Sequence, residues 1–195
     1  MSYRIFTDAT SDLPAKFAQD WNVTILPMGF TMEEKEYLYI PGKSDMPIET
    51  FFAKMREGVG VTTAQINTFT FIEAFEPVLQ AGEDVLYIGF SSKLSGTVQS
   101  AQTTAEELAA KYPNRKVIVI DSLCASLGEG LLVYYAARKQ ASLGIEELAA
   151  WVESNKVRFA HWFTVDDLVF LKRGGRIGGE LLWPSSINST SLKPM

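Results

Sequence analysis

The stretch DVLYIGFSSKLSGT, residues 84–97, decides the fold class of this chain. Its first half predicts a buried strand, and a helix with apolar residues at helical spacing is expected directly after it, over 97–112. Further along, KVIVI (116–120) is a continuous apolar run typical of a strand buried on both faces of a parallel sheet. Helices are expected next at 126–141 and 145–155. Strands that alternate with helices predict an α/β fold, with an open and mostly parallel sheet flanked by helices.

The remaining predicted elements extend this pattern in both directions along the chain. Residues 31–47 are mixed, acidic and punctuated by Pro and Gly, so we expect a loop or an irregular strand pair there. Asp12 is expected to cap a helix whose first turn contains Pro14. The other expected elements are strands at 3–7, 23–30 and 158–164, and helices at 47–56, 68–80 and 166–172.

Composition narrows the class of protein. Hydrophobic residues make up 47% and charged residues 21% of the 195 residues, as in a soluble globular protein. The net charge of −5 and the pI near 5.0 give no attraction to a phosphate backbone, so no nucleic-acid partner is expected. No apolar run has the length of a transmembrane helix, and the N-terminus has no signal-peptide core. A single cysteine cannot form an intrachain disulfide, so a cytoplasmic location is expected.

The single histidine and the single cysteine exclude several kinds of site. Zinc sites built from Cys and His lack ligands, and a Ser-His-Asp or Cys-His enzyme has only His161 to use. His161 alternates with aromatic and apolar residues, which favours a structural role in a strand. Cys124 lies among small residues and is expected to be a packed, unreactive thiol. We therefore predict no metal site, although composition alone leaves a carboxylate-bound magnesium ion open.

The loop SSKLSGT, residues 91–97, is the strongest candidate for a binding site. It joins a buried strand to the clearest helix, and it carries three serines, one threonine and Gly96. A helix N-terminus exposes N–H groups and the positive end of the helix dipole, so a carboxylate or phosphate is the expected ligand group. A helix cap needs one hydroxyl, whereas this loop offers four.

Two other segments can contribute to an anion site. GVTTAQIN (60–67) is a predicted loop that includes Thr63 and could meet the first loop across the sheet edge, although a turn with a helix cap explains it as well. The segment KRGGR (172–176) contains three cations. Lys172 and Arg173 are explained as the basic last turn of a helix that ends in a glycine C-cap. Arg176 lies beyond that cap, where it could meet a phosphate or an acidic partner.

Polar residues follow three of the predicted strands. Asp8 ends the first, Ser91 and Ser92 follow the strand at 84–90, and Asp121 follows KVIVI. In open parallel sheets, ligands bind beyond the carboxyl ends of the strands. Strand-to-helix loops also need capping and turn residues for their own sake, so both interpretations stay open.

Five motifs are spread along the chain in this order: TDATSDLP (7–14), TTAQIN (62–67), SSKLSGT (91–97), IDSLCASLGEG (120–130) and HWFTVDDLVFLKRGGRI (161–177). Together, and in this order, they resemble the motifs of the DegV family. The likeness implies a two-lobed α/β fold that encloses one long-chain fatty acid between its lobes. It further implies a bacterial carrier that presents the acid to a fatty-acid kinase, with no catalytic activity of its own and no cofactor besides the bound acid.

The resemblance also implies roles for individual residues. Thr63 matches the family's carboxylate-holding threonine. The family's carboxylate-holding serine falls within SSKLSGT, where Ser95 is the first choice and Ser92 the second, and the N–H groups at Gly96 complete the site. Arg176 resembles the arginine that the family links to the kinase or the acyl phosphate.

The likeness ends near Ile177, because the tail GGELLWPSSINSTSLKPM has no sustained period and does not match the family. We therefore expect a DegV-like first lobe at 1–157, the start of a second lobe at 158–177 and an atypical tail at 178–195. The resemblance implies that most of the second lobe is absent, along with a family histidine that helps to hold the carboxylate.

Two other functions stay open beside the carrier. An acyl- or phosphoryl-transfer enzyme could use the same anion-binding loop, with Asp8 or Asp121 holding magnesium. A fragment that binds no ligand is the third possibility. Each makes a different prediction for what the purified protein carries.

Overall fold

A computed structural model describes residues 2–162 and 167–176. The backbone divides into two compact units, Met1–Trp162 and Phe163–Met195. The first unit contains a four-stranded sheet with the strand order β2-β1-β6-β7, in which all neighbours are parallel. This arrangement confirms the predicted α/β class. The strands are β1 (Tyr3–Asp8), β2 (Val23–Leu26), β6 (Asp84–Gly89) and β7 (Val117–Asp121).

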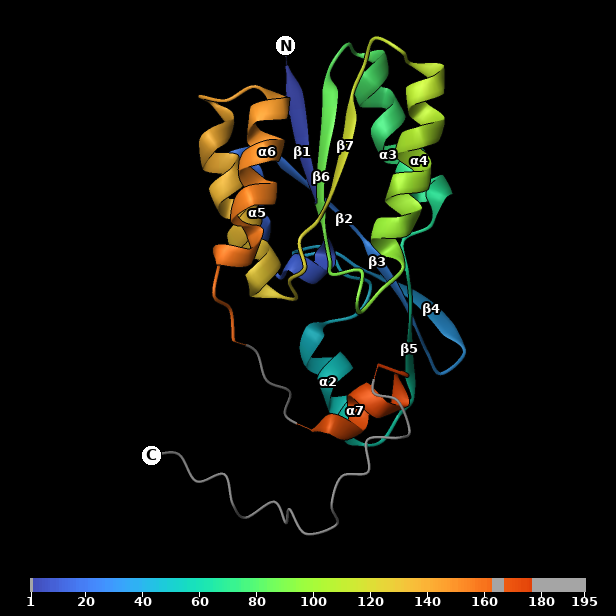
Figure 1. Cartoon of the computed structure of the whole chain (residues 1–195). Coiled ribbons are helices and arrows are strands. Elements are labelled where there is room, and N and C mark those ends of the chain that lie inside the picture. Colours follow the sequence, from blue (N-terminus) through green and yellow to red (C-terminus); the bar gives the residue numbers. More distant parts are fainter. Residues whose placement is uncertain (1, 163–166, 177–195) are drawn as a thin grey trace. The chain divides into compact units, whose positions relative to one another are not determined.

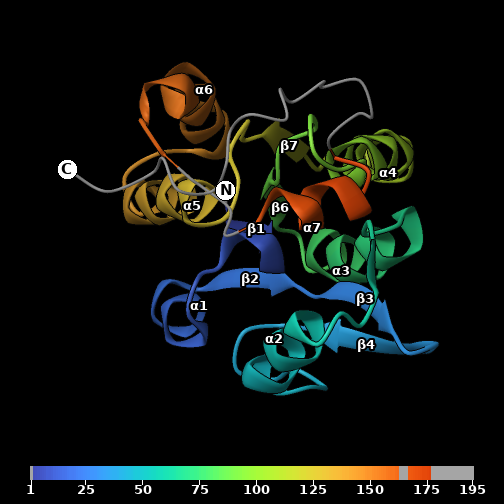
Figure 2. The same ribbon diagram turned by 90° about the horizontal axis from the view of Figure 1, so that it is seen from below.

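Helices cover both faces of the parallel sheet, so its central strands have no exposed side (Figures 1 and 2). One core joins Ile5 and Leu86 of the sheet to α5 and α6, and the other joins Phe6 and Tyr87 to α3 and α4. All six residues of β6 are buried, as a strand covered on both faces requires. The helices are α1 (Ala15–Trp21), α3 (Thr68–Gln80), α4 (Thr97–Lys111), α5 (Leu127–Gln140) and α6 (Ile145–Asn155).

A second, smaller sheet lies beyond the carboxyl ends of β1 and β6 (Figure 1). Its three strands are antiparallel in the order β4-β3-β5. A small core of Phe30, Met32 and Met46 joins this sheet to Phe51 and Met55 of the helix that covers it. The elements are β3 (Met28–Met32), β4 (Lys35–Tyr39), β5 (Val61–Ala64) and α2 (Ile48–Arg56).

The expected single strand at 23–30 was wrong, because the chain changes sheets at Pro27. Proline has no N–H to give to a ladder, so it fits the junction between β2 and β3 better than a strand interior. The irregular strand pair expected after it is a hairpin of β3 and β4. Glu33 and Glu34 form its two-residue turn, both with positive φ (52° and 62°), as the tight turns of twisted hairpins require.

Three other expectations need correction. Residues 61–64 form β5 and not part of a loop, because they pair with β3. Asp12 does not cap α1: it has a left-handed backbone (φ 53°), and Pro14 occupies the N-cap position. The expected strand at 158–164 is absent over 158–162, where a 3₁₀ turn (Lys156–Arg158) leads into an extended segment without a partner strand. Residues 163–166 lie outside the described part.

The second unit is described only over residues 167–176. Here α7 (Leu168–Arg173) overlaps the helix expected at 166–172, and it is capped by Asp167, whose carboxylate accepts a hydrogen bond from Val169 N at 2.8 Å. The helix ends at the two glycines as predicted, with Gly175 at φ +71°. Among the helices that the structure describes, none combines the length and the apolar character needed to cross a bilayer.

Candidate functional site

The hydroxyl-rich loop at 91–97 is held in place mainly by its backbone. It connects β6 to α4 at the carboxyl end of the parallel sheet. Ser91 N donates to Cys124 O at 3.0 Å, and Ser92 N donates to the Asp121 carboxylate at 3.1 Å. Ser95 N donates to Ser91 O at 3.2 Å, which closes the loop on itself. These bonds leave the side chain of Ser92 exposed and that of Ser95 half-buried at the start of α4.

The segment after β5 meets this loop, as the sequence suggested. Ile66 N donates to Thr97 Oγ1 at 3.3 Å, and Gln65 Nε2 donates to Ser100 Oγ at 3.2 Å. The amide of Gln65 also covers Gly96, since a Cβ at position 96 would lie 2.1 Å from Gln65 Oε1. Two segments about thirty residues apart are thereby fixed against each other at the N-terminus of α4.

Replacing Gly96 with alanine is expected to displace the Gln65 side chain. The backbone of Gly96 (φ −79°) suits alanine, so the contact with Gln65 is the obstacle. Because Gln65 is flexible and can turn away, we expect thermal unfolding to show a loss of no more than about 1 kcal/mol. The double variant Gly96→Ala/Gln65→Ala should lose no more than Gln65→Ala alone. A further loss in the double variant would show that the backbone, and not Gln65, requires glycine.

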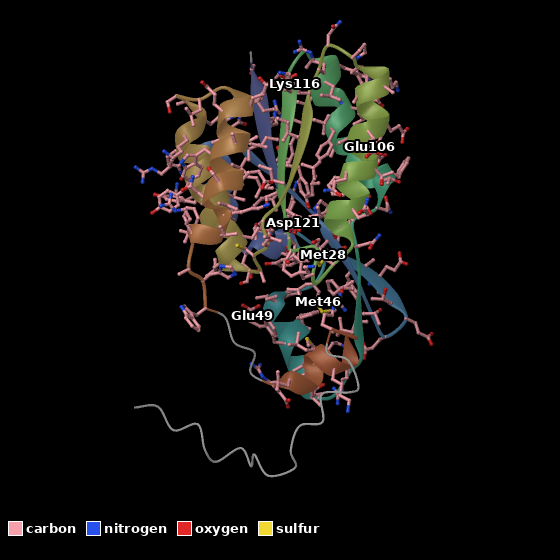
Figure 3. All side chains as sticks on the ribbon, viewed as in Figure 1. Met28, Met46, Glu49, Glu106, Lys116 and Asp121 are labelled. Atoms are coloured by element: carbon pink, nitrogen blue, oxygen red, sulfur yellow. The ribbon has the colours of Figure 1, made fainter. Side chains whose placement is uncertain are left out.

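An apolar cavity of about 160 Å³ lies between the small sheet and α2. Met28 and Met46 lie near each other in the region between the parallel sheet and α2 (Figure 3). Thr63 contributes a hydroxyl-bearing side chain from β5, opposite Phe30 in the strand register. The lining residues are Asp12, Met28, Phe30, Tyr39, Met46, Ile48, Phe51 and Thr63.

Charge is distributed unevenly around this cavity. Among the described residues that line it, Asp12 is the one acidic residue, and its carboxylate accepts a hydrogen bond from Ser126 Oγ. Burial, with the Asp12 charge as the smaller contribution, raises the pKa of Tyr39, so this phenol stays neutral. The charge of Asp12 repels a carboxylate at that side of the cavity, whereas the Thr63 hydroxyl carries no charge.

A buried carboxyl pair at the end of β1 was missed by sequence reasoning. Asp8 and Glu129 are both fully buried. Tyr87 OH donates to Asp8 Oδ2 at 2.6 Å, and Thr7 Oγ1 donates to Glu129 Oε1 at 2.9 Å. The Thr10 hydroxyl lies within hydrogen-bond distance of both carboxyl groups, at Asp8 Oδ1 and, 3.2 Å away, at Glu129 Oε2. The only sequence signal was Glu129 between two glycines in a family motif, which does not reveal its burial.

Glu129 keeps its proton to a higher pH than an ordinary glutamate. Burial is the main cause that raises its pKa well above the ordinary value, and the nearby Asp8 charge adds to the effect. Hydrogen-bond counting agrees, because Thr10 has one hydroxyl hydrogen and cannot donate to two carboxylates. A proton on Glu129 Oε2 can bond to Thr10 Oγ1, which leaves the Thr10 hydrogen for Asp8.

The two carboxylates considered for magnesium are engaged in other contacts. Asp8 is buried and accepts hydrogen bonds from Tyr87 and Thr10. Asp121, at the carboxyl end of β7 (Figure 3), accepts the amides of Ser92 and Leu123 through Oδ1. Within residues 2–162 and 167–176, no three His, Cys, Asp or Glu side chains come together as a metal site requires. Both carboxylates thus hold the loops that follow their strands. This is the turn-and-cap role that the sequence left open beside ligand binding.

Cys124 and His161 form a packed contact. Cys124 is buried, and its Sγ lies 3.5 Å from His161 Nδ1. Burial raises the pKa of this thiol to about 11, so it is not a thiolate at neutral pH. The ring of His161 covers Gly128, where a Cβ would lie 2.7 Å from it. The predicted packed thiol is confirmed, and His161 lies in an extended segment and not in the strand that was expected.

Arg176 belongs to the second unit. It follows the glycine cap of α7, where its backbone N–H donates to Leu171 O at 2.9 Å and its guanidinium donates to Gly174 O at 2.6 Å. The side chain is exposed. Its suggested contact with a partner stays a prediction.

The fold and the cavity together define an α/β protein with a site suited to a hydrocarbon ligand. Comparison with known proteins agrees with this class. The family model described as "Uncharacterised protein, DegV family" matches residues 2–182. The chain belongs to the DegV family.

Individual relatives show how much of a family member this chain represents. A DegV domain-containing protein of Clostridium perfringens is 42% identical over 192 residues, which are 98% of this chain and 65% of that protein. A fatty-acid-binding DegV family protein from Thermus thermophilus is 35% identical with a TM-score of 0.78, over 92% of this chain and 62% of that one. The fatty acid kinase B3 protein of Streptococcus pneumoniae, loaded with linoleic acid, shares the fold at 21% identity and a TM-score of 0.72, over 91% and 62%. The chain thus spans somewhat less than two thirds of these proteins.

Proposed function

We propose that this chain binds a long-chain fatty acid and presents its carboxylate to a fatty-acid kinase, with no chemistry of its own. The observation that carries the proposal is the apolar cavity that Thr63 lines, on a segment fastened to the Ser95 loop. The acyl chain occupies the cavity. Its carboxylate lies at the hydroxyls of Thr63 and Ser95 and the N–H groups near Gly96, with Ser92 as the alternative donor. Fatty-acid binding by the related Thermus protein supports this choice of ligand.

The cavity as it stands fits only part of a long chain. Apolar cavities of about 150 Å³ in proteins take a molecule the size of benzene, so 160 Å³ holds roughly six carbons. A longer chain requires the cavity to widen. Helix α2 is the wall that can move, because none of its residues is buried while Ile48 and Phe51 line the cavity.

Native mass spectrometry of the purified 195-residue protein tests the proposal. We expect a co-purifying species with the mass of a fatty acid, released when the protein is denatured. Delipidated protein should take up one equivalent of hexadecanoic acid. An empty protein that takes up no acid would support the non-binding fragment, and metal-dependent release of phosphate from ATP or an acyl phosphate would support the enzyme.

Arg176→Ala is expected to impair kinase turnover without affecting lipid binding. The side chain is exposed beyond the helix cap, so its loss should change stability by no more than about 0.5 kcal/mol. An exposed ion pair contributes about 0.2–1 kcal/mol, so acyl phosphate formation should slow by up to about fivefold. The measurement is the rate at limiting carrier concentration with a bacterial fatty-acid kinase and ATP.

Arg173→Ala is the matched control for this experiment. Arg173 is the last residue of the short helix α7, three positions before Arg176, and it is also exposed, but it precedes the glycine cap. We expect it to leave turnover unchanged. Equal slowing by both variants would mean that the net charge of this segment matters and Arg176 has no particular role.

A further inference from the structure

Three hydrogen bonds of one buried residue, Thr97, link the segment after β5 to Ser95; two involve its side chain and one its backbone N–H. Thr97 is 1% exposed, and its Oγ1 accepts the N–H of Ile66 at 3.3 Å. The same Oγ1 lies 3.0 Å from Ser95 Oγ. The backbone N–H of Thr97 also donates to Ser95 Oγ, at 3.3 Å.

Counting hydrogens gives the direction of the Thr97–Ser95 bond. Each hydroxyl has one hydrogen and two lone pairs. Among the residues that the structure describes, Ser95 Oγ is the one hydrogen-bond acceptor in reach of the Thr97 hydroxyl. If Ser95 donated to Thr97, the Thr97 hydrogen would be buried without an acceptor, which folded proteins avoid. Thr97 is therefore the donor.

The direction of this bond fixes what Ser95 offers to a ligand. With Thr97 N–H and Thr97 O–H both donating to it, Ser95 Oγ has its lone pairs occupied. Its own hydrogen is left for a group outside the loop, and Ser95 is only half-buried. A carboxylate accepts hydrogen bonds and cannot donate them, so it requires a serine in this state.

We propose that Thr97 is a positioning residue that makes the Ser95 hydroxyl a hydrogen-bond donor for the ligand carboxylate. This inference rests on the proposed function. Thr97 also accepts the N–H of Ile66, three residues after Thr63, so one side chain keeps both candidate donors in place. Ser100 makes the second link between these segments, through Gln65, but it does not touch Ser95.

The test compares binding of hexadecanoic acid with binding of its methyl ester, both delivered from cyclodextrin, to the 195-residue protein. Thr97→Val keeps the shape of the side chain and removes its hydroxyl. Without the Thr97 hydroxyl, Ser95 can still donate, but its hydroxyl is no longer oriented toward the ligand. We therefore expect the affinity for the acid to fall by up to about tenfold, and the affinity for the ester to change much less. Thr97→Ser keeps the hydroxyl and should restore the acid preference. If Thr97→Val does not fold, Thr97→Cys replaces it, because a thiol is a weak donor.

Ser100→Ala is the matched control, since it cuts the other link between the two segments and leaves Ser95 untouched. It should keep the acid preference of the wild type. If Ser100→Ala and Thr97→Val have equal effects, or if Thr97→Val loses acid and ester alike, Thr97 only holds the backbone and the inference is overturned. If wild type and Thr97→Val prefer the acid equally, the proposed function stands and this inference fails. A wild type without any preference for the acid overturns both.

Discussion

Replacing Ser95 with alanine is expected to weaken binding of a long-chain fatty acid by about 10- to 150-fold, because a hydrogen bond to a charged group contributes about 1.5–3 kcal/mol. The acyl chain supplies most of the affinity, at roughly 0.8 kcal/mol per buried methylene, but this contribution does not depend on the head group. Selection of the acid must therefore come from fixed donors such as Ser95. Titration of the acid and its methyl ester against wild type and Ser95→Ala measures the effect.

The ester and a second serine serve as controls for this prediction. The ester has no charge to stabilise, so its affinity should change much less than that of the acid. Ser92→Ala removes a hydroxyl from the same loop, on an exposed side chain whose backbone is fixed by Asp121. Equal losses of acid and ester in Ser95→Ala would mean that Ser95 only shapes the loop. A selective loss in Ser92→Ala alone would transfer the role to Ser92.

Glu129→Gln is expected to stabilise the protein at neutral pH. Glu129 is protonated when folded, because burial raises its pKa well above the ordinary value. The unfolded chain releases this proton above about pH 4.3, so each further pH unit costs up to about 1.4 kcal/mol of folding free energy until the folded pKa is reached. Glutamine never ionises, and its amide can accept from Thr7 and donate to Thr10 as the protonated acid does.

The expected result is a difference in stability that grows with pH. Wild type and Glu129→Gln should unfold at similar denaturant concentrations near pH 4, and the variant should become the more stable as pH rises from there. Glu129→Ala should lose about 2–4 kcal/mol near pH 4, since it leaves a cavity and an unpaired Thr7 hydroxyl. This loss should shrink as pH rises, because the variant has no buried carboxyl group that must stay protonated.

Glu106→Gln is the matched control for the pH series. Glu106 is an exposed glutamate on α4 (Figure 3), so its replacement should not alter the pH dependence of stability. If Glu129→Gln is less stable than wild type at pH 7, then Glu129 is ionised in the folded protein. In that case the proton of the buried pair does not belong to Glu129.

Local sequence was sufficient to predict the main sheet and its helices. KVIVI and DVLYIGF are strands because their apolar residues can be buried on both faces, and α4 begins where SSKLSGT ends because its apolar positions then repeat at helical spacing. Gly175 ends α7 because it accepts a positive φ (71°) that other residues avoid. These preferences act within a few residues and require no partner.

The second sheet depended on pairing that the sequence does not display. VTTA has short polar side chains and resembles a loop, yet it forms β5 because β3 offers it a ladder of backbone hydrogen bonds. In contrast, 158–162 alternates like a strand, yet it begins in a 3₁₀ turn and pairs with no strand in the part of the chain that the structure describes. Whether a segment becomes a strand is decided by its partner, which lies elsewhere in the chain.

The sequence by itself determined the α/β class, the family and the loop whose hydroxyls suit an anion. Only the tertiary structure brought Thr63 to an apolar cavity, placed Gln65 over Gly96 and joined Ile66 to Thr97. It alone buried Glu129 beside Asp8 and so changed the charge of that residue. The physical reason is distance along the chain. Hydrophobic periodicity and helix capping depend on residues that are close in sequence. A cavity wall, a buried hydrogen bond and a shifted pKa depend on residues from about thirty to more than a hundred positions apart.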